Sequence, residues 1–158
     1  MKKLLLLTLT AGLLLTAGSE IKAQTYQHAL GGRLGTANGI TFKTFVNRNN
    51  ALDFILNFQD KRHYSYFRFT GLYEIHNPIN NAPGLTWYYG PGGTIGNRHL
   101  KDTEDNDLLL SVDGVLGLDY KFNGAPINLA LDWKPAIEIV PETQFDAQGL
   151  GLSIRFTF

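Results

Sequence analysis

The sequence predicts an all-β fold, an eight-stranded antiparallel up-and-down transmembrane β-barrel. Three observations lead to this prediction. Apolar and polar residues alternate with a period of two in eight segments, which is typical of strands whose two faces meet different surroundings. Turn-forming residues lie between these segments. The central positions of the apolar parity carry almost no charge, as expected for a surface in contact with hydrocarbon.

The N-terminus has the organisation of a secretory signal peptide. Lys2 and Lys3 precede an apolar run from Leu4 to Leu15, and small residues follow as far as Ala23. The apolar run is shorter than the roughly 20 residues that a spanning helix needs. We therefore expect a signal peptide over residues 1–23 and a barrel domain over residues 24–158. Cleavage within residues 17–19 and an uncleaved anchor are the alternatives.

The alternating segments define the expected strands. The last one is the clearest, because Leu152, Ile154 and Phe156 share one parity while Ser153 and Arg155 share the other. The connections over residues 96–107 and 138–148 are expected to be the main outer loops. The eight expected strands cover residues 30–35, 40–46, 52–58, 67–76, 85–89, 110–122, 127–134 and 150–158.

Alternation alone does not say which face points inward. A soluble barrel of the lipocalin kind has its apolar face inside, whereas a membrane barrel has it outside. Aromatic residues fall near the ends of the expected strands, and two aromatic belts are typical of the two membrane interfaces. This distribution favours the membrane. The expected periplasmic belt contains Tyr73, Trp87, Tyr120 and Phe158, and the outer belt contains Phe58, Phe67 and Trp133.

The opposite parity carries charges of both signs in similar number. An eight-stranded barrel is only wide enough inside for side chains, so these charges must pair with one another. Arg33 and Arg155 lie on the first and last strands, which must adjoin for the barrel to close, so both need acidic partners. The expected lumen residues are Arg33, Lys43, Arg68, Lys121, Lys134 and Arg155, together with Asp53, Glu74, Asp113, Asp119 and Asp132.

The composition argues against several other classes of protein. The chain has no cysteine, so no disulfide framework stabilises it and no lipid anchor follows the signal peptide. The 14 basic and 14 acidic residues balance, which gives no indication of a nucleic-acid partner. We expect a monomer whose partner is membrane lipid, without a cofactor.

The residues also resemble a known group of proteins. The last nine residues, Leu150 to Phe158, resemble the C-terminal assembly signal of outer-membrane proteins, although such signals often have tyrosine where this chain has Phe156. The whole expected mature chain is similar to small outer-membrane β-barrel proteins of Gram-negative bacteria, with the architecture of the OmpA and OmpX barrels. This resemblance implies an outer-membrane location and contact with the assembly machinery through the C-terminal strand, but no agreed activity. The motifs concerned are GRLG at 32–35, GLYE at 71–74, WYYG at 87–90, GLDYKF at 117–122 and DWKP at 132–135.

One pair of residues suggests an enzymatic alternative. His63 and Ser65 share the spacing of the histidine and serine in barrel lipid A deacylases of the PagL kind, which also use a glutamate on a neighbouring strand. Glu74 has the opposite parity and lies further along the same expected strand, so no orienting acid is evident. We therefore expect a structural or surface-interaction barrel with a polar, side-chain-filled lumen and no catalytic residue. A lipid-modifying enzyme and a narrow pore are the alternatives.

Other candidate sites carry little specific signal. The acidic segment 101–107 could hold calcium, but it lacks the glycine spacing of an EF-hand and is interpreted as a solvated loop. The glycine-rich segment 90–93 lacks the lysine and helix of a phosphate-binding loop. His28, His76 and His99 do not have the spacing of metal ligands. No metal-binding or cofactor-binding residue is assigned.

Overall fold

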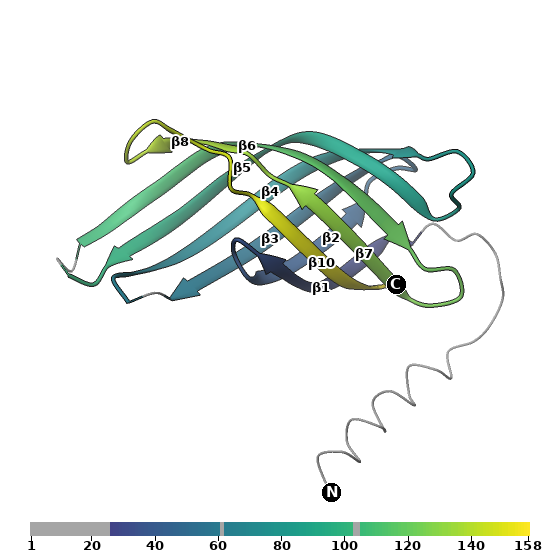
Figure 1. Ribbon diagram of the computed structural model, residues 1–158, viewed down its shortest axis with the longest axis horizontal. Coiled ribbons are helices and arrows are strands. Elements are labelled where there is room, and N and C mark those ends of the chain that lie inside the picture. Colours follow the sequence, from purple (N-terminus) through teal and green to yellow (C-terminus); the bar gives the residue numbers. More distant parts are fainter. Residues whose placement is uncertain (1–25, 61, 103–104) are drawn as a thin grey trace, which may run out of the picture.

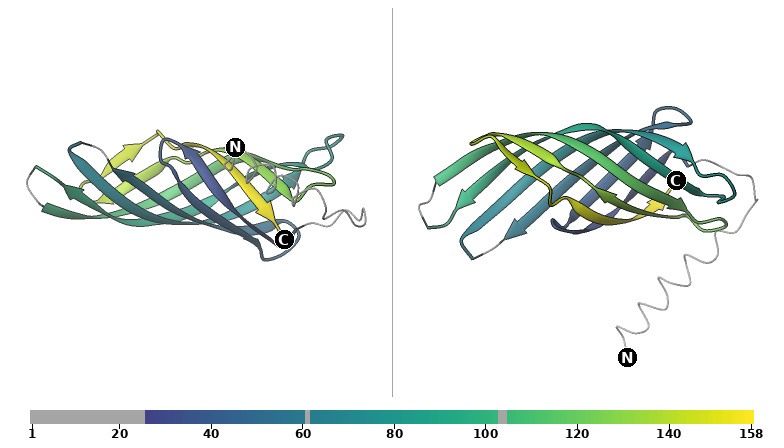
Figure 2. Two further views of the ribbon diagram at one scale, coloured as in Figure 1. Left: turned by 90° about the horizontal axis from the view of Figure 1, so that it is seen from below. Right: turned by 45° about the horizontal axis from the view of Figure 1, so that its top comes forward.

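The computed structural model describes residues 26–60, 62–102 and 105–158. The expected signal peptide lies outside the described residues, so its cleavage site stays a prediction. The described chain forms a closed barrel of tilted antiparallel strands (Figures 1 and 2). None of the described residues forms a helix of the length and hydropathy needed to cross a bilayer.

The barrel wall consists of eight strands, as the sequence predicts. Seven follow one another along the chain, and β10 returns to pair with both β1 and β7, while β5 pairs with β6 to complete the circle. β8 and β9 form a hairpin that extends the wall beside β6. The strands are β1 (His28–Gly35), β2 (Gly39–Phe45), β3 (Asn50–Asp60), β4 (Tyr64–Pro78), β5 (Leu85–Leu100), β6 (Asp105–Lys121), β7 (Ile127–Trp133), β8 (Ala136–Val140), β9 (Gln144–Asp146) and β10 (Leu150–Thr157).

The pairing of β1 with β10 confirms the expected closure. Gly31 lies opposite Arg155, and the backbone groups of His28 and Phe158 bond to each other at 2.9 Å. The first and last strands therefore meet at one end of the barrel, which we call the near end. The opposite end, with the turns after β1, β3 and β5, is the far end (Figure 1). Closure leaves no sheet edge at the level of the near half, where all eight strands pair on both sides.

The outside is apolar and the inside is charged. Along β10, Leu152, Ile154 and Phe156 are exposed, whereas Arg155 is 1% exposed and Ser153 is fully buried. Lys43 and Glu74 have no exposed surface at all, although charged side chains are seldom fully buried. This distribution of apolar and charged side chains is the reverse of that in a soluble protein. It confirms the inside and outside assignment made from parity and is the arrangement that a membrane barrel requires.

The lumen also contains an apolar layer, which the expectation of a polar lumen did not include. Ile55, Leu72, Tyr88, Val115 and Ala130 point inward and form one buried cluster. An apolar side chain on the inward parity breaks the alternation, so the pattern gave no separate signal for it. A lumen filled by side chains holds no continuous water that would require a polar lining. Apolar side chains can therefore pack there beside the ion pairs.

The strands differ in length, and this corrects the two expected outer loops. The segment 96–107 is largely strand, because β5 runs to Leu100 and β6 begins at Asp105, with Asn97 paired to Leu108. The segment 138–148 contains parts of β8 and β9, with Ile137 paired to Phe145. Asparagine, glycine and proline in these segments suggest turns locally. The long ladder between β5 and β6 stabilises extended backbone in the first segment, and the pairing of β8 with β6 and β9 does so in the second.

The unequal lengths leave the far end asymmetric. β1, β2, β7 and β10 have eight, seven, seven and eight residues, whereas β3 to β6 have 11, 15, 16 and 17. In Figure 1 the wall of β1, β2 and β10 ends partway along the barrel, while β4, β5 and β6 continue. Within the described residues, β9 pairs only with β8. The wall is therefore interrupted between β9 and the far part of β3, and we call this interruption the notch.

Candidate functional site

The near half of the lumen is filled by a network of charged groups from many strands. Arg155 on β10 donates from Nη2 to Asp53 Oδ2 at 2.5 Å, from Nε to Thr41 Oγ1 at 3.0 Å and from Nη1 to Asn128 Oδ1 at 3.2 Å. These partners come from β3, β2 and β7. The last strand is thus connected across the lumen to the opposite wall.

Lys43 occupies the middle of this network. Its Nζ lies 2.7 Å from Glu74 Oε2 and 3.1 Å from Asp119 Oδ2, and it sits 4.4 Å from the ring centre of Tyr88. Glu74 Oε2 also contacts His76 Nε2 at 2.9 Å. One ammonium group placed between two carboxylates and above an aromatic face compensates for the loss of water around all of them.

Arg33 forms a separate bidentate pair. Its Nη1 and Nη2 donate to the two oxygens of Asp132 at 2.8 and 2.5 Å, and the hydroxyl of Tyr88 donates to Asp132 Oδ2 at 2.8 Å. Gly117 permits this geometry, because a Cβ there would lie 2.6 Å from Cζ of Tyr88. Tyr88 thereby connects the Arg33 pair to Lys43. The expectation that Arg33 and Arg155 belong to one network with acidic partners is confirmed.

The expected lumen charges lie inside the barrel and form pairs, as predicted, with two exceptions. Lys134 reaches Asp113 at 3.3 Å, and Arg68 reaches Glu138 at 3.3 Å. Glu138 was not among the expected lumen acids, because its segment was interpreted as a loop. Lys121 was expected in the lumen, but its Nζ donates to the carbonyls of Phe122 and Ala125 at the near rim. β6 ends at this lysine, so its long side chain caps the turn that follows.

The far half of the lumen opens into a small polar cavity, which we call the vestibule. Its enclosed part has a volume of about 40 Å³, enough for only a few water molecules. Arg33, one of the cations that line it, is already paired with Asp132. The cavity is lined by Arg33, Thr36, Ala37, Asn57, Arg68, Thr94, Ser111, Lys134, Ala136, Glu138, Asp146, Gln148 and Gly149.

The residues of the enzymatic alternative do not come together around Glu74. Glu74 is buried in the lumen with Lys43, whereas His63 lies in the exposed turn before β4. His63 Nδ1 instead contacts Asp102 Oδ2 at 3.1 Å. Ser65 lies opposite His99 in the ladder, and among the described residues no hydrogen bond joins it to either histidine. Asp102 is the acidic partner that sequence reasoning missed, since strand pairing brings the two turns together.

The other sequence candidates have ordinary structural environments. In the part of the chain that the structure describes, no group of three histidine or acidic side chains could hold a metal ion. Glu104 and the side chain of Asp105 are outside that part. His28 contacts Thr44 at 2.9 Å and His99 contacts Asn106 at 3.0 Å. The glycine-rich segment 90–93 lies within β5, where a Cβ on Gly90 would meet the carbonyl oxygen of Tyr73.

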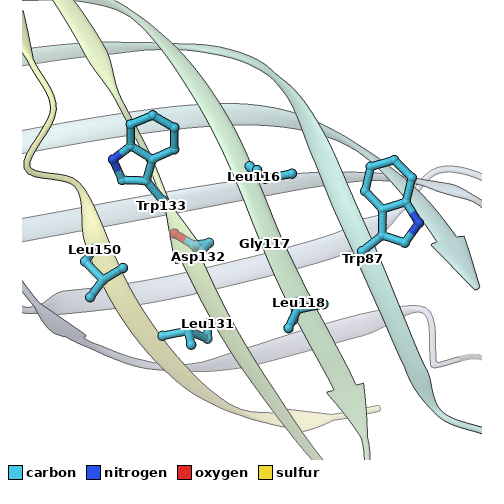
Figure 3. A pocket seen from close by; sticks show the side chains of 8 residues that line it. All are labelled: Trp87, Leu116, Gly117, Leu118, Leu131, Asp132, Trp133 and Leu150. Atoms are coloured by element: carbon cyan, nitrogen blue, oxygen red, sulfur yellow. The ribbon is translucent and has the colours of Figure 1, made fainter. Parts of the chain in front are cut away.

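A hollow of about 350 Å³ also lies on the outer wall, over β5, β6, β7 and β10 (Figure 3). Trp87 and Trp133 stand on either side of it, and Leu116, Leu118 and Leu131 project between them. Trp133 Nε1 donates to the carbonyl of Ala147 at 2.7 Å, which fixes its indole. The hollow is apolar and faces away from the lumen, so its surface suits an apolar group such as a hydrocarbon chain.

Comparison with known proteins gives one informative likeness. No protein family matches the chain, and no curated protein sequence is similar to it. Its fold is similar to the crystal structure of Neisserial surface protein A (NspA), with a TM-score of 0.54 and 10% identity. The likeness covers 83% of this chain and 93% of that one. At this identity it shows a shared fold, a closed eight-stranded barrel like those of small outer-membrane proteins.

Proposed function

We propose that this chain is an integral barrel of the bacterial outer membrane whose lumen is closed, and that its role is structural or one of surface interaction. The observation that carries the proposal is the combination of an apolar exterior with buried ion pairs that fill the near half of the lumen. Arg33, Lys43 and Arg155 each have carboxylate partners within 3.1 Å, so the barrel is filled rather than hollow.

Two further features support residence in the outer membrane. The expected signal peptide would export the chain, and the similarity in fold to a Neisserial surface protein agrees with that destination. The apolar outward face needs a hydrocarbon environment, because a soluble monomer seldom exposes so continuous an apolar surface.

The far end is the part best suited to surface interaction. β3 to β6 carry it beyond the short wall, and its tips bear polar pairs: Lys101 lies next to Asp60, and His63 Nδ1 lies 3.1 Å from Asp102 Oδ2. These pairs are exposed, so they contribute little to stability and remain accessible to a partner. With the near end carrying both barrel termini, the far end would face outward.

A conductance measurement tests the closed lumen. Purified barrel is inserted into planar lipid bilayers, and we expect no steady single-channel current, because buried ion pairs fill the cross-section. The double variant Lys43→Ala with Arg155→Ala removes the largest central groups and serves as the comparison. Steady ion conduction by the unaltered protein would overturn the closed-lumen proposal and favour a narrow pore.

A further inference from the structure

The barrel wall is interrupted beside the vestibule. The notch lies between β9 and the far part of β3, beyond the far ends of β1 and β10 (Figure 1). Apolar side chains point outward on all four of these strands, and the most exposed, Phe145, has 63% of its surface accessible. The polar vestibule therefore meets the apolar exterior at the notch. The outward side chains around it are Leu34, Phe58, Phe145 and Leu150.

Two guanidinium groups share one carboxylate at the vestibule: that of Arg68, which lines the cavity, and that of Arg98, which lies outside the lining. Glu138 forms ion pairs with both of them: Oε1 lies 3.3 Å from Arg68 Nη2, and Oε2 lies 4.0 Å from Arg98 Nη2. The guanidinium of Arg68 lies 4.5 Å from the ring centre of Tyr66, and its buried Nε has no hydrogen-bond partner among the described residues. One carboxylate between two guanidiniums leaves a net positive charge and an unsatisfied donor.

An unmatched anion lies in the same cavity. Asp146 on β9 lines the vestibule, and its Oδ1 accepts a hydrogen bond from the backbone of Gln148 at 2.8 Å. No lysine, arginine or histidine of the described chain lies within 4.0 Å of its carboxylate. The vestibule therefore has separate positive and negative groups, each available to a ligand of the opposite sign.

We propose that the vestibule binds a phosphate that also carries an amine, as in a phosphoethanolamine headgroup, with the phosphate on Arg68 and Arg98 and the ammonium on Asp146. Guanidinium groups suit phosphate because their fixed donors match its oxygens. The enclosed part holds only a few water molecules, so the headgroup would lie in the open mouth of the vestibule. The notch lets the hydrocarbon tails of a lipid remain outside, against Phe58 and Phe145.

The proposal names a ligand for the surface-interaction role and rests on the proposed membrane residence. The same chemistry could come from a lipid headgroup or from a free phosphoethanolamine. The notch favours the lipid, since apolar side chains beside a polar site add affinity only for a ligand with an apolar part. Binding measured in detergent tests the site without depending on where the protein resides in the cell or on whether the lumen conducts.

The experiment is a lipid titration of the folded barrel in a non-ionic detergent, followed by native mass spectrometry. The probes are phosphatidylethanolamine, phosphatidylcholine, phosphatidylglycerol and soluble O-phosphoethanolamine. We expect phosphatidylethanolamine to bind about tenfold more tightly than phosphatidylcholine, whose methylated amine donates no hydrogen bond to Asp146. Soluble O-phosphoethanolamine should bind more weakly than the lipid, because it lacks the tails.

Three variants give different expected results. Arg68→Gln should weaken phosphatidylethanolamine binding about tenfold or more, through loss of charge-assisted hydrogen bonds. Asp146→Asn should remove the preference for the ethanolamine lipid over the choline lipid. Glu138→Gln should strengthen binding of both phosphatidylethanolamine and phosphatidylglycerol, because it frees the two guanidiniums. A purely structural role for Glu138 would give no gain in binding.

The control is Arg62→Gln, an exposed arginine in the turn before β4 that does not line the vestibule. It should bind like the unaltered protein. The proposal would be overturned if all three lipids bound equally and none of the variants changed their binding. That result would show only a general lipid shell. Equal affinity for the soluble headgroup and the lipid would overturn the lipid source.

Discussion

Arg155 illustrates how single residues hold this barrel together. It is almost wholly buried, yet each of its three donor nitrogens has a partner, on β3, β2 and β7. The sequence indicated that this residue points inward and needs an acid, because it alternates with apolar neighbours in the last segment. It could not identify Asp53 as that acid, since parity places several carboxylates in the lumen and only the register selects one.

Replacing Arg155 with alanine should destabilise the protein strongly. The change leaves Asp53 buried without its cation, and breaking one partner of a buried pair typically costs about 3–5 kcal/mol. Thermal unfolding in detergent should therefore show a clearly lower Tm. The control Leu152→Ile, on the outward face of the same strand, should change the Tm little. A neutral Arg155→Ala would contradict the structural importance of the network.

The hydroxyl of Tyr88 provides a finer test at the same scale. Tyr88→Phe removes the hydrogen bond to Asp132 but keeps the ring against Lys43 and His76. We expect a loss in the free energy of unfolding of about 1–2 kcal/mol. Tyr89→Phe is the matched control, because the adjacent ring points outward and is 43% exposed. Equal effects of the two changes in urea titrations would argue against a specific role for the Tyr88 hydroxyl.

At the scale of elements, the sequence predicted the barrel strands but not the hairpin of β8 and β9. β9 has only three residues, too few for alternation to be recognised, and Pro135 and Pro141 adjoin β8. The hairpin contributes Glu138 and Asp146, so these two acidic residues of the vestibule were also beyond prediction. Arg68, Lys134 and Asp113 were assigned inward from parity alone, whereas Glu138, the partner of Arg68, lay in a segment interpreted as a loop.

The last strand is also the element expected to contact the assembly machinery. Deleting Phe158, or replacing it with glutamate, should reduce insertion in cells more than it reduces folding in detergent. The reason is that Phe158 lies outside the lumen network and is 61% exposed. The measurement is the amount of folded protein in isolated outer membranes, which reports insertion in cells, and in refolding reactions, which report folding in detergent.

Phe156→Tyr is the control for this assembly prediction, because related terminal signals often have tyrosine at that position. It should insert as well as the unaltered chain. Normal insertion of a variant that lacks Phe158 would contradict the proposed recognition of the C-terminal strand.

For the whole molecule, the closed ladder and the apolar exterior together predict behaviour in detergent. The protein should fractionate with outer membranes and should stay folded in detergent at room temperature. Boiling should then change its electrophoretic migration, because only heating opens a barrel whose eight strands all pair on both sides in the near half. Recovery from the periplasm as a soluble protein without detergent would contradict the membrane barrel.

The ion pairs of the lumen have a consequence for how the barrel forms. Arg155 and Asp53 are 102 residues apart in the chain, and Arg33 and Asp132 are 99 apart. Neither pair can form until the two ends of the sheet meet, so a partly wound sheet would hold uncompensated charges next to hydrocarbon. Intermediates should accordingly be scarce, and unfolding should be all-or-none. The test is denaturant unfolding of two variants, one that keeps only Trp87 and one that keeps only Trp133. Their tryptophan fluorescence should change at the same denaturant concentration. Transitions at two different concentrations would show that the barrel opens in stages.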